Sequence, residues 1–213
     1  FSACSDNDDP TPDTGTSETD AKFEAIAKQY LDHTVYVTYK NLADETEQLV
    51  KDLQALKSSK TDANVKATCE TFLEARAWWE KSEAFLYGAA TDFGIDPHID
   101  SWPLDLDGLQ TALKNTEQVE AMGGEDGDIY AGEKLGNSLL GFHGIEYILF
   151  EDGSPKSVSK ISDLHLTYAV AVAGDLRNRC WQLELSWRGE SAVNADRVAK
   201  VANELELPYT LNR

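Results

Sequence analysis

Apolar residues recur at helical spacing almost without interruption from Thr19 onward, and this periodicity restricts the chain to a helical fold. The first run covers residues 19–58 and carries Phe23, Ile26, Tyr30, Leu42, Leu49, Leu53 and Leu56. It ends at Ser58-Ser59-Lys60, after which Thr61 or Asp62 can cap a second helix that extends to about Leu86. Residues 35–39 have strand propensity, but they lie inside the helical pattern, and propensity alone is a weak guide.

Further helices are expected at about 105–121, 131–151, 159–187 and 191–208, separated by turns rich in glycine and proline. Residues 88–103 contain two glycines and two prolines and are expected to form an ordered loop. Short connections favour antiparallel neighbours. The sequence therefore predicts an all-α fold, an antiparallel up-and-down helical bundle resembling a four-helix bundle.

The composition excludes several classes of function. The 213 residues include 38 acidic and 19 basic side chains, which gives a formal net charge of −19. A chain this acidic lacks the Lys and Arg that a nucleic-acid backbone or an anionic lipid surface requires. No apolar run approaches the roughly 18 residues of a membrane span. The hydrophobic fraction of 41% is sufficient for a buried core.

Residues 1–20 contain six carboxylates and neither Lys nor Arg, and are expected to form a disordered tether ahead of a helical domain at 21–213. The order Phe1-Ser2-Ala3-Cys4 resembles the end of a bacterial lipoprotein signal, with Cys4 as the lipidated residue. The acidic run after it looks like the export tag of Bacteroidetes-type surface lipoproteins. These features predict a lipid anchor in the outer membrane, facing the periplasm or the cell surface; an ordinary free cysteine is the alternative.

Cys69 and Cys180 both fall in helical patterns, far apart in the sequence. We expect buried free thiols, since that is the commoner state of isolated helical cysteines, and a disulfide between them is the alternative.

The most informative local motif is Gly141-Phe142-His143-Gly144-Ile145-Glu146. On a helix, His143 and Glu146 are neighbours on one face, and that face also carries apolar residues. A buried carboxylate is costly unless it is paired, hydrogen-bonded or bound to a cation. Gly141 and Gly144 weaken the helix, which indicates close approach by another backbone or by a ligand. A purely structural His–Glu pair is the alternative.

This G-x-H-x-x-E pattern resembles the signature of the imelysin family, which is also labelled as a peptidase and includes iron-regulated proteins. Two further stretches, residues 81–88 (KSEAFLYG) and 99–105 (IDSWPLD), agree with the family in order and spacing. The resemblance extends from about Ala21 to the C-terminus. It implies two helical-bundle halves with the G-x-H-x-x-E site near their junction, so this chain would correspond to the N-terminal half.

The candidate site residues follow from the motif, the helical phase and the resemblance. His143 and Glu146 are candidates both for catalysis and for metal binding. Glu83 is the third candidate metal ligand, because the helical phase places it on the same apolar stripe as Phe72 and Trp79. A structural charge pair is the alternative for Glu83 and for Arg76. The candidate ligand-binding residues are Asp100, Trp102, Gly141 and Gly144.

Other residues have simpler interpretations. Trp102 is expected first as a core anchor, with ligand contact as the alternative, and Asp105 as a helix cap. Asp126 and Asp128 lie in a glycine-rich turn that superficially looks like a calcium loop, but the turn lacks the terminal Glu. Three isolated histidines are expected at the surface or at helix caps: His33, His98 and His165.

One imidazole and two carboxylates offer a mixed nitrogen and oxygen site suited to iron, zinc or copper. The resemblance implies iron, and our first expectation is a cell-envelope accessory protein of iron uptake that binds a metal ion or a small iron-containing ligand. A metallopeptidase is the alternative, although the sequence lacks H-E-x-x-H and G-x-S-x-G. A non-catalytic interaction module is a third possibility.

Overall fold

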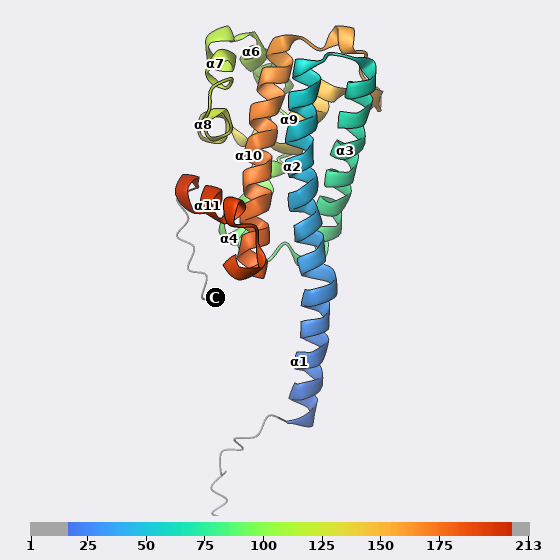
Figure 1. Ribbon diagram of the computed structural model, residues 1–213, viewed down its shortest axis with the longest axis vertical. Helices are drawn as coiled ribbons and strands as arrows, with labels where there is room; N and C mark the ends of the chain where they lie inside the picture. Colours follow the sequence, from blue (N-terminus) through green and yellow to red (C-terminus); the bar gives the residue numbers. More distant parts are fainter. Residues whose placement is uncertain (1–16, 206–213) are drawn as a thin grey trace, which may run out of the picture.

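Three long helices run side by side and form the main part of the fold: α2 (Tyr36–Ser58), α3 (Asp62–Lys81) and α10 (Asp163–Arg188) (Figure 1). The computed structural model describes residues 17–205. Helix α2 lies between α3 and α10, and a short turn makes α2 and α3 antiparallel. The Thr61 hydroxyl accepts a hydrogen bond from the Asn64 N–H at 3.1 Å and caps α3, as predicted. The predicted all-α class is confirmed.

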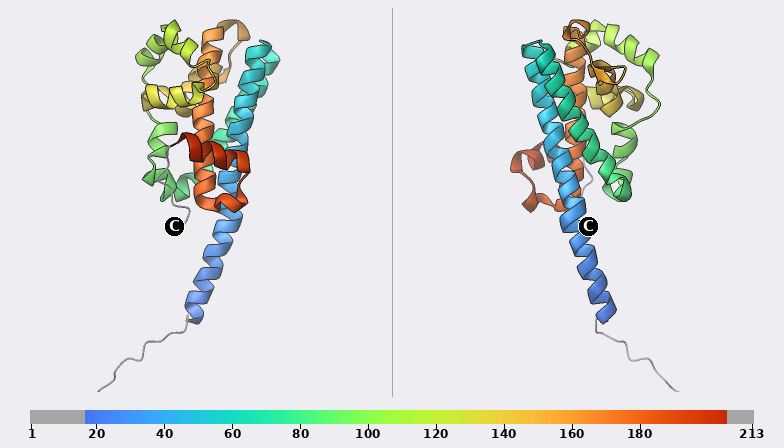
Figure 2. Two further views of the ribbon diagram at one scale, coloured as in Figure 1. Left: turned by 60° about the vertical axis from the view of Figure 1, so that its left-hand side comes forward. Right: turned by 90° about the vertical axis from the view of Figure 1, so that its right-hand side faces the viewer.

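Short helices take the place of a regular fourth helix. Those within residues 89–149 cover the other side of α10, whereas the last one lies across α10 and α2, as Figure 2 shows. They are α4 (Ala89–Asp92), α5 (Ile95–Ile99), α6 (Leu106–Lys114), α7 (Thr116–Ala121), α8 (Gly127–Lys134), α9 (Gly141–Leu149) and α11 (Ala195–Glu204). Single 3₁₀ turns connect them: η2 (Ser82–Phe85), η3 (Asn137–Leu139), η4 (Val158–Lys160) and η5 (Glu190–Ala192). A hairpin of β1 (Phe150–Glu151) and β2 (Ser154–Pro155) pairs Phe150 with Pro155.

Two helices that the sequence predicted as continuous are interrupted, and a third begins later than expected; local caps explain one of the breaks and the late start. Asp105 caps α6, as predicted, by accepting from the Gly108 N–H at 2.9 Å. Asn115 then ends α6 and caps α7. Around Leu135 and Gly136 the backbone is extended, which separates α8 from α9. Asn194 caps α11, so the last helix begins several residues later than expected.

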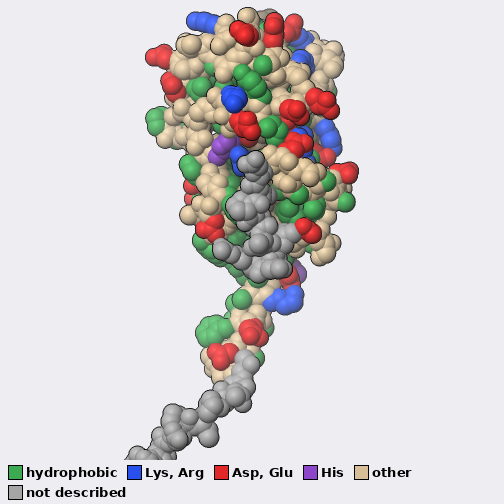
Figure 3. Space-filling view, turned by 90° about the vertical axis from the view of Figure 1, so that its left-hand side faces the viewer, with side chains coloured by type: hydrophobic (Ala, Val, Ile, Leu, Met, Phe, Trp, Pro, Cys, Tyr) green, Lys and Arg blue, Asp and Glu red, His purple; other side chains and the backbone are tan. Residues whose placement is uncertain are grey.

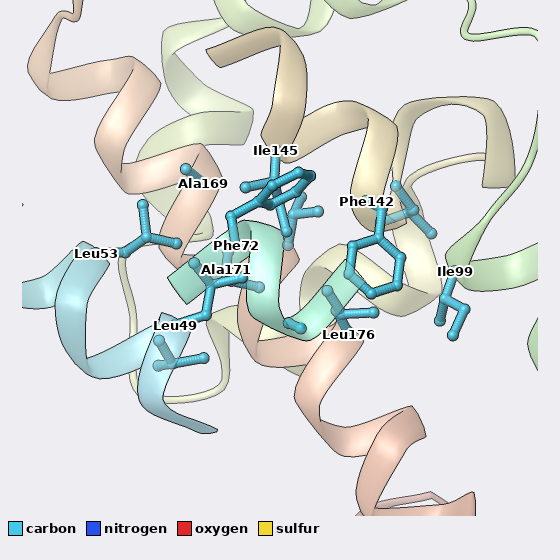
Figure 4. Close-up of a cluster of buried hydrophobic side chains, with 14 of the residues drawn as sticks. Leu49, Leu53, Phe72, Ile99, Phe142, Ile145, Ala169, Ala171 and Leu176 are labelled. Atoms are coloured by element: carbon cyan, nitrogen blue, oxygen red, sulfur yellow. The ribbon is translucent and has the colours of Figure 1, made fainter. Parts of the chain in front are cut away.

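Helix α10 is buried on nearly all of its sides and forms the centre of the core. Its small residues allow α2, α8 and α9 to approach closely, because few side-chain atoms separate the backbones. Figure 4 shows Ile145 of α9 close to Phe72 of α3, and Phe142 of α9 on the side of Ile99 and Leu176. The two-phenylalanine contact, with ring centroids 5.8 Å apart, fixes α9 against α3.

Helix α1 (Glu18–Tyr30) continues into α2 through the π-helical segment η1 (Leu31–Val35) and projects beyond the bundle (Figure 3). None of its residues is buried; Phe23 and Ile26 continue the helical spacing of the apolar residues but are 66% and 63% exposed. A capping box from Ser17 starts the helix at Glu18, before the expected boundary at residue 21. The rest of the expected tether, with Cys4, lies outside the described residues.

Cys69 and Cys180 are buried free thiols, as predicted. Burial raises the pKa of Cys69 to about 12 and also raises that of Cys180, which keeps both groups as unreactive thiols. Within residues 17–205, no helix combines the length and the apolarity that crossing a membrane demands.

Candidate functional site

Helix α9 begins where the end of α5 passes directly behind it, and two glycines make this approach possible. Gly141 has a φ of +64°, and a Cβ there would overlap the carbonyl of Ile99. A Cβ on Gly144 would lie 2.7 Å from the carbonyl oxygen of Leu139. Of the two interpretations in the sequence analysis, the structure supports close approach by backbone. Both glycines are buried and position the helix that carries His143.

His143 lies between two carboxylates. Its Nε2 is 3.0 Å from Asp100 Oδ1, and its Nδ1 is 3.2 Å from Glu146 Oε2. An ionised carboxylate only accepts hydrogen bonds. The hydrogen bonds to Asp100 and to Glu146 can therefore form together only when both nitrogens of the His143 ring carry a proton. The His143 side chain is 16% exposed, whereas that of Glu146 is 53% exposed. The Asp100 edge of the ring therefore faces the interior, and the Glu146 edge faces solvent.

Asp100 is held by two side chains of α3. Arg76 pairs with its Oδ1, and the Trp79 indole N–H donates to its Oδ2 at 2.9 Å. Arg76 also pairs with Glu80 at 2.6 Å. Burial acts to lower the pKa of Arg76, but the hydrogen bond and charge of Asp100 outweigh it and the pKa is raised. Arg76 therefore belongs to a structural ion pair, which was the alternative interpretation from the sequence. Its partner is Asp100 and not Glu83.

A pocket of about 430 Å³ opens beside His143. Its lining comes from α3, the loop after α5, α9 and the β1–β2 hairpin: Phe72, Leu73, Trp102, Leu104, His143, Glu146, Tyr147, Phe150, Asp152 and Gly153. Trp102 is 74% exposed, and its ring centroid is 4.9 Å from that of His143. The prediction of Trp102 as a core anchor is therefore wrong, because its loop crosses over the imidazole instead of entering the core.

Glu83 is not brought to this site. Helix α3 ends at Lys81, and Glu83 lies with an exposed side chain on the 3₁₀ turn η2. A 3₁₀ turn advances about 120° per residue instead of about 100°, so the helical phase used to place Glu83 inward no longer applies. Within residues 17–205, no three His, Cys, Asp or Glu side chains are arranged to hold one metal ion. Asp100 and Glu146 contact opposite nitrogens of His143 and do not converge.

Three further residues singled out in the sequence lie away from the pocket lining. Asp128 pairs with Arg177 and Lys200, both at 2.9 Å. His165 forms a capping box with Ser162 at the start of α10, which confirms one predicted capping histidine. His33 is exposed, as expected for a surface histidine.

His98 was expected at the surface or at a cap, but its side chain is only 12% exposed and pairs with Asp175 of α10 at 2.7 Å. Because His98 lies on α5 just before Asp100, the pair fixes the segment that presents Asp100 to His143. The sequence did carry one signal for it: Asp175 is a lone carboxylate within the apolar run 168–176.

Comparison with known proteins identifies the family. The family model described as Imelysin matches residues 35–207. Iron-regulated protein A of Synechococcus elongatus is 31% identical over 163 residues, which is 76% of this chain and 40% of that protein.

Two solved structures share the fold. A protein described as an iron-regulated protein A precursor, from Parabacteroides distasonis, superposes with a TM-score of 0.70 at 26% identity, over 94% of this chain and 55% of that one. An imelysin peptidase from Bacteroides ovatus gives a TM-score of 0.56 at 33% identity, over 65% of this chain and 39% of that one. This chain thus spans between 39% and 55% of the length of these three relatives. With 173 of its residues (35 to 207) matched to the family model, the chain belongs to the imelysin family.

Proposed function

We propose that this chain is a cell-envelope accessory protein of iron uptake that binds an iron-containing small ligand at His143 and Glu146. Iron is the cargo in this proposal. The iron assignment is supported by similarity to proteins named as iron-regulated. The observation that carries the binding site is the approach of His143 Nδ1 to Glu146 Oε2 at 3.2 Å, at the mouth of a pocket.

Asp100 supports this role by orienting the imidazole. When Nε2 donates its proton to Asp100, the lone pair of Nδ1 is left on the solvent side, beside Glu146. A carboxylate that accepts from the far nitrogen of a metal-binding histidine fixes its tautomer and increases its basicity. Arg76 and Trp79 hold that carboxylate in place. The nitrogen and oxygen donors are of the type that iron, zinc and copper accept.

The spacing of the two donors suits adjacent positions on one metal ion. Bonds of about 2.1 Å at a right angle separate neighbouring donors by about 3.0 Å. His143 Nδ1 and Glu146 Oε2 are 3.2 Å apart, so a small side-chain adjustment is sufficient. With two protein donors, the other coordination positions belong to water or to a chelator that travels with the metal.

The same donor set fits a resident catalytic metal poorly. A metallopeptidase site needs about three protein ligands and a separate base that activates water. Here Glu146 would have to serve as both ligand and base, and residues 17–205 supply no third ligand. The described residues therefore favour binding of a cargo over the peptidase alternative.

Calorimetric titration with ferric nitrilotriacetate tests the proposal, because this chelate leaves two coordination positions free. We expect His143→Ala and Glu146→Ala each to weaken binding at least tenfold while the helical circular dichroism signal is retained. Glu83→Ala is the matched control, since it removes an exposed carboxylate outside the pocket lining, and its affinity should stay within twofold of the wild type. Unchanged binding in His143→Ala contradicts the proposal. Chelator-sensitive peptide cleavage that requires His143 would instead support the peptidase alternative.

The lipid anchor on Cys4 is a separate part of the proposal and rests on the residues that precede it. Expression of the full precursor in a Gram-negative host should give a membrane-bound protein with the mass of a triacylated cysteine. The Cys4→Ser variant should be released into the soluble fraction. Soluble wild-type protein with an unmodified Cys4 thiol contradicts the anchor.

A further inference from the structure

The pocket beside the donor pair has an unusually aromatic wall. Trp102 lies next to His143 and is 74% exposed, and Leu73, also in the lining, is 56% exposed. Phe72 and Phe150, whose ring centroids are 5.4 Å apart, complete this apolar surface. The volume of about 430 Å³ falls within the range of about 300–1,000 Å³ that small-molecule pockets occupy. A hydrated metal ion would gain nothing from such a wall.

The charges around the pocket are negative. Glu146 and Asp152 contribute carboxylates to the lining, and none of the described lining residues is Lys or Arg. Two cations that contact residues of the site are already engaged. Arg76 is paired with Asp100 and Glu80, and Lys156 donates to the carbonyl of Tyr147 and lies over that residue's ring. The whole chain carries a net charge of −19, which repels anions at longer range.

We propose that the natural cargo is a neutral or positively charged metal chelate with a flat aromatic face and two adjacent open coordination positions. His143 and Glu146 fill the open positions, and the aromatic face packs against Trp102. This inference rests on the proposed function and adds the class of chelator. An anionic chelate would meet Glu146 and Asp152 without a counter-charge, and a chelator that fills all six positions would leave none for His143.

Two copper complexes of equal charge separate the aromatic contribution from metal coordination. The 1:1 complexes of Cu²⁺ with 2,2′-bipyridine and with ethylenediamine both leave two adjacent positions open, but only the first has an aromatic face. Binding of each complex is followed by calorimetry and by electron paramagnetic resonance. The binding measured with the His143→Ala variant is taken as background at other sites and is subtracted from that of the wild type. The wild-type chain is expected to bind the bipyridine complex at least tenfold more tightly.

Trp102→Ala should reduce the affinity for the bipyridine complex about tenfold and leave the ethylenediamine complex within twofold. Because Trp102 is exposed, the variant is expected to keep its fold. Leu106→Ala is the matched control, since Leu106 is a large apolar residue, 46% exposed, outside the pocket lining. The Cu²⁺ complex of bipyridine-4,4′-dicarboxylate should bind at least tenfold more weakly than the Cu²⁺ complex of bipyridine, because its carboxylates meet Glu146 and Asp152. Asp152→Asn should reduce this difference in affinity.

Each failure has its own signature. Equal affinity for the two copper complexes, or an equal loss of both in Trp102→Ala, overturns the aromatic-chelate inference and leaves the donor pair intact. Binding of neither complex, or binding that His143→Ala does not change, overturns the proposed function itself. Preference for the dicarboxylate complex overturns the argument that Glu146 and Asp152 reject negatively charged groups on the cargo, and with it the exclusion of anionic chelates.

Discussion

Asp100 determines how His143 is presented. It pairs with Arg76, accepts the Trp79 N–H and lies 3.0 Å from His143 Nε2. The three contacting side chains come from α3 and α9 and share the two oxygens of the Asp100 carboxylate. A carboxylate held by its neighbours in this way limits the rotation of the imidazole and favours one tautomer. The ring edge beside Glu146 is thereby left for a ligand.

Replacing Asp100 by Asn tests this orientation. The substitution keeps the shape of the side chain but removes its charge and the acceptor of the Trp79 N–H. Loss of such a supporting carboxylate typically weakens metal binding by about 10- to 100-fold. We expect Asp100→Asn to weaken binding of ferric nitrilotriacetate at least tenfold by calorimetry. Glu80→Gln, which removes the charge of the other partner of Arg76, should leave the affinity for ferric nitrilotriacetate within threefold of the wild type. Equal losses of affinity in the two variants would contradict the role of Asp100.

Gly141 and Gly136 form a matched pair for the packing of α9. At Gly141 a methyl group would overlap the Ile99 carbonyl and the backbone has positive φ, whereas a Cβ at Gly136 meets no atom within 4 Å and φ is −70°. We expect Gly141→Ala to lower the free energy of unfolding by about 2 kcal/mol or more. Gly136→Ala should change it by less than about 1 kcal/mol. Urea unfolding measures both, and a neutral Gly141→Ala would refute the close contact.

Ion pairs from one side chain of α11 join this helix to both α2 and α10. Arg197 reaches Asp44 at 2.7 Å and both Glu47 and Glu184 at 2.8 Å. The Glu184 side chain is 2% exposed, so the loss of Arg197 leaves a buried carboxylate that keeps, among residues 17–205, Arg188 as its ion-pair partner. Breaking a buried pair is costly because the remaining charge stays desolvated.

We therefore expect Arg197→Met to lower the free energy of unfolding by about 2 kcal/mol, a value reduced from the fully buried case because Asp44 is partly exposed. Hydrogen exchange in α11 should increase in the same variant. Lys51→Met is the control, since Lys51 pairs with Glu47 at the surface and is 58% exposed, and should change stability by less than about 0.5 kcal/mol. Equal effects of the two variants would show that Arg197 does not fasten the helix.

Helix periodicity predicted the long helices well, and its failures have local causes. The leucines of α2 repeat on one face because that face packs on both α3 and α10. Glu83 was misplaced because its helix ends at Lys81 and tightens into a 3₁₀ turn that begins at Ser82. The helix expected at 105–121 is broken because Asn115 accepts from the Gln118 N–H, a cap that competes with helix continuation.

The site was only partly accessible from the sequence. His143 and Glu146 are three residues apart, so helical geometry alone predicted their contact. The contact between His143 and Asp100 depends on how α5, α3 and α9 pack, and no local pattern encodes it. Trp102 was assigned to the core because a large aromatic residue is usually buried, and only the fold shows that it lies at the pocket.

The charge network makes the stability of the whole molecule sensitive to acid. Burial acts to raise the pKa of Asp44, Glu47 and Asp128, but hydrogen bonds and charges from their cationic partners outweigh it, so the pKa of each is lowered. The folded state then binds protons less readily than the unfolded chain. This stabilisation is present above a pH of about 4 and is lost as the pH falls through the lowered values.

Urea unfolding at a series of pH values should therefore show falling stability below a pH of about 4. Glu45 and Asp96, whose pKa burial raises, oppose this trend. Arg197→Met removes the cation shared by Asp44 and Glu47 and should make the pH dependence shallower. A wild-type protein whose stability is constant down to a pH of about 2 would contradict the network.

The central claim is that His143 Nδ1 and Glu146 bind the metal of a small cargo. The most direct test is an anomalous difference map from crystals of the protein grown with ferric nitrilotriacetate, with data collected on either side of the iron absorption edge. The account predicts an iron peak about 2.1 Å from Nδ1 of His143 and within bonding distance of a Glu146 oxygen, with Asp100 still on Nε2. An iron peak elsewhere, or iron bound while His143 keeps both carboxylate contacts, would contradict it.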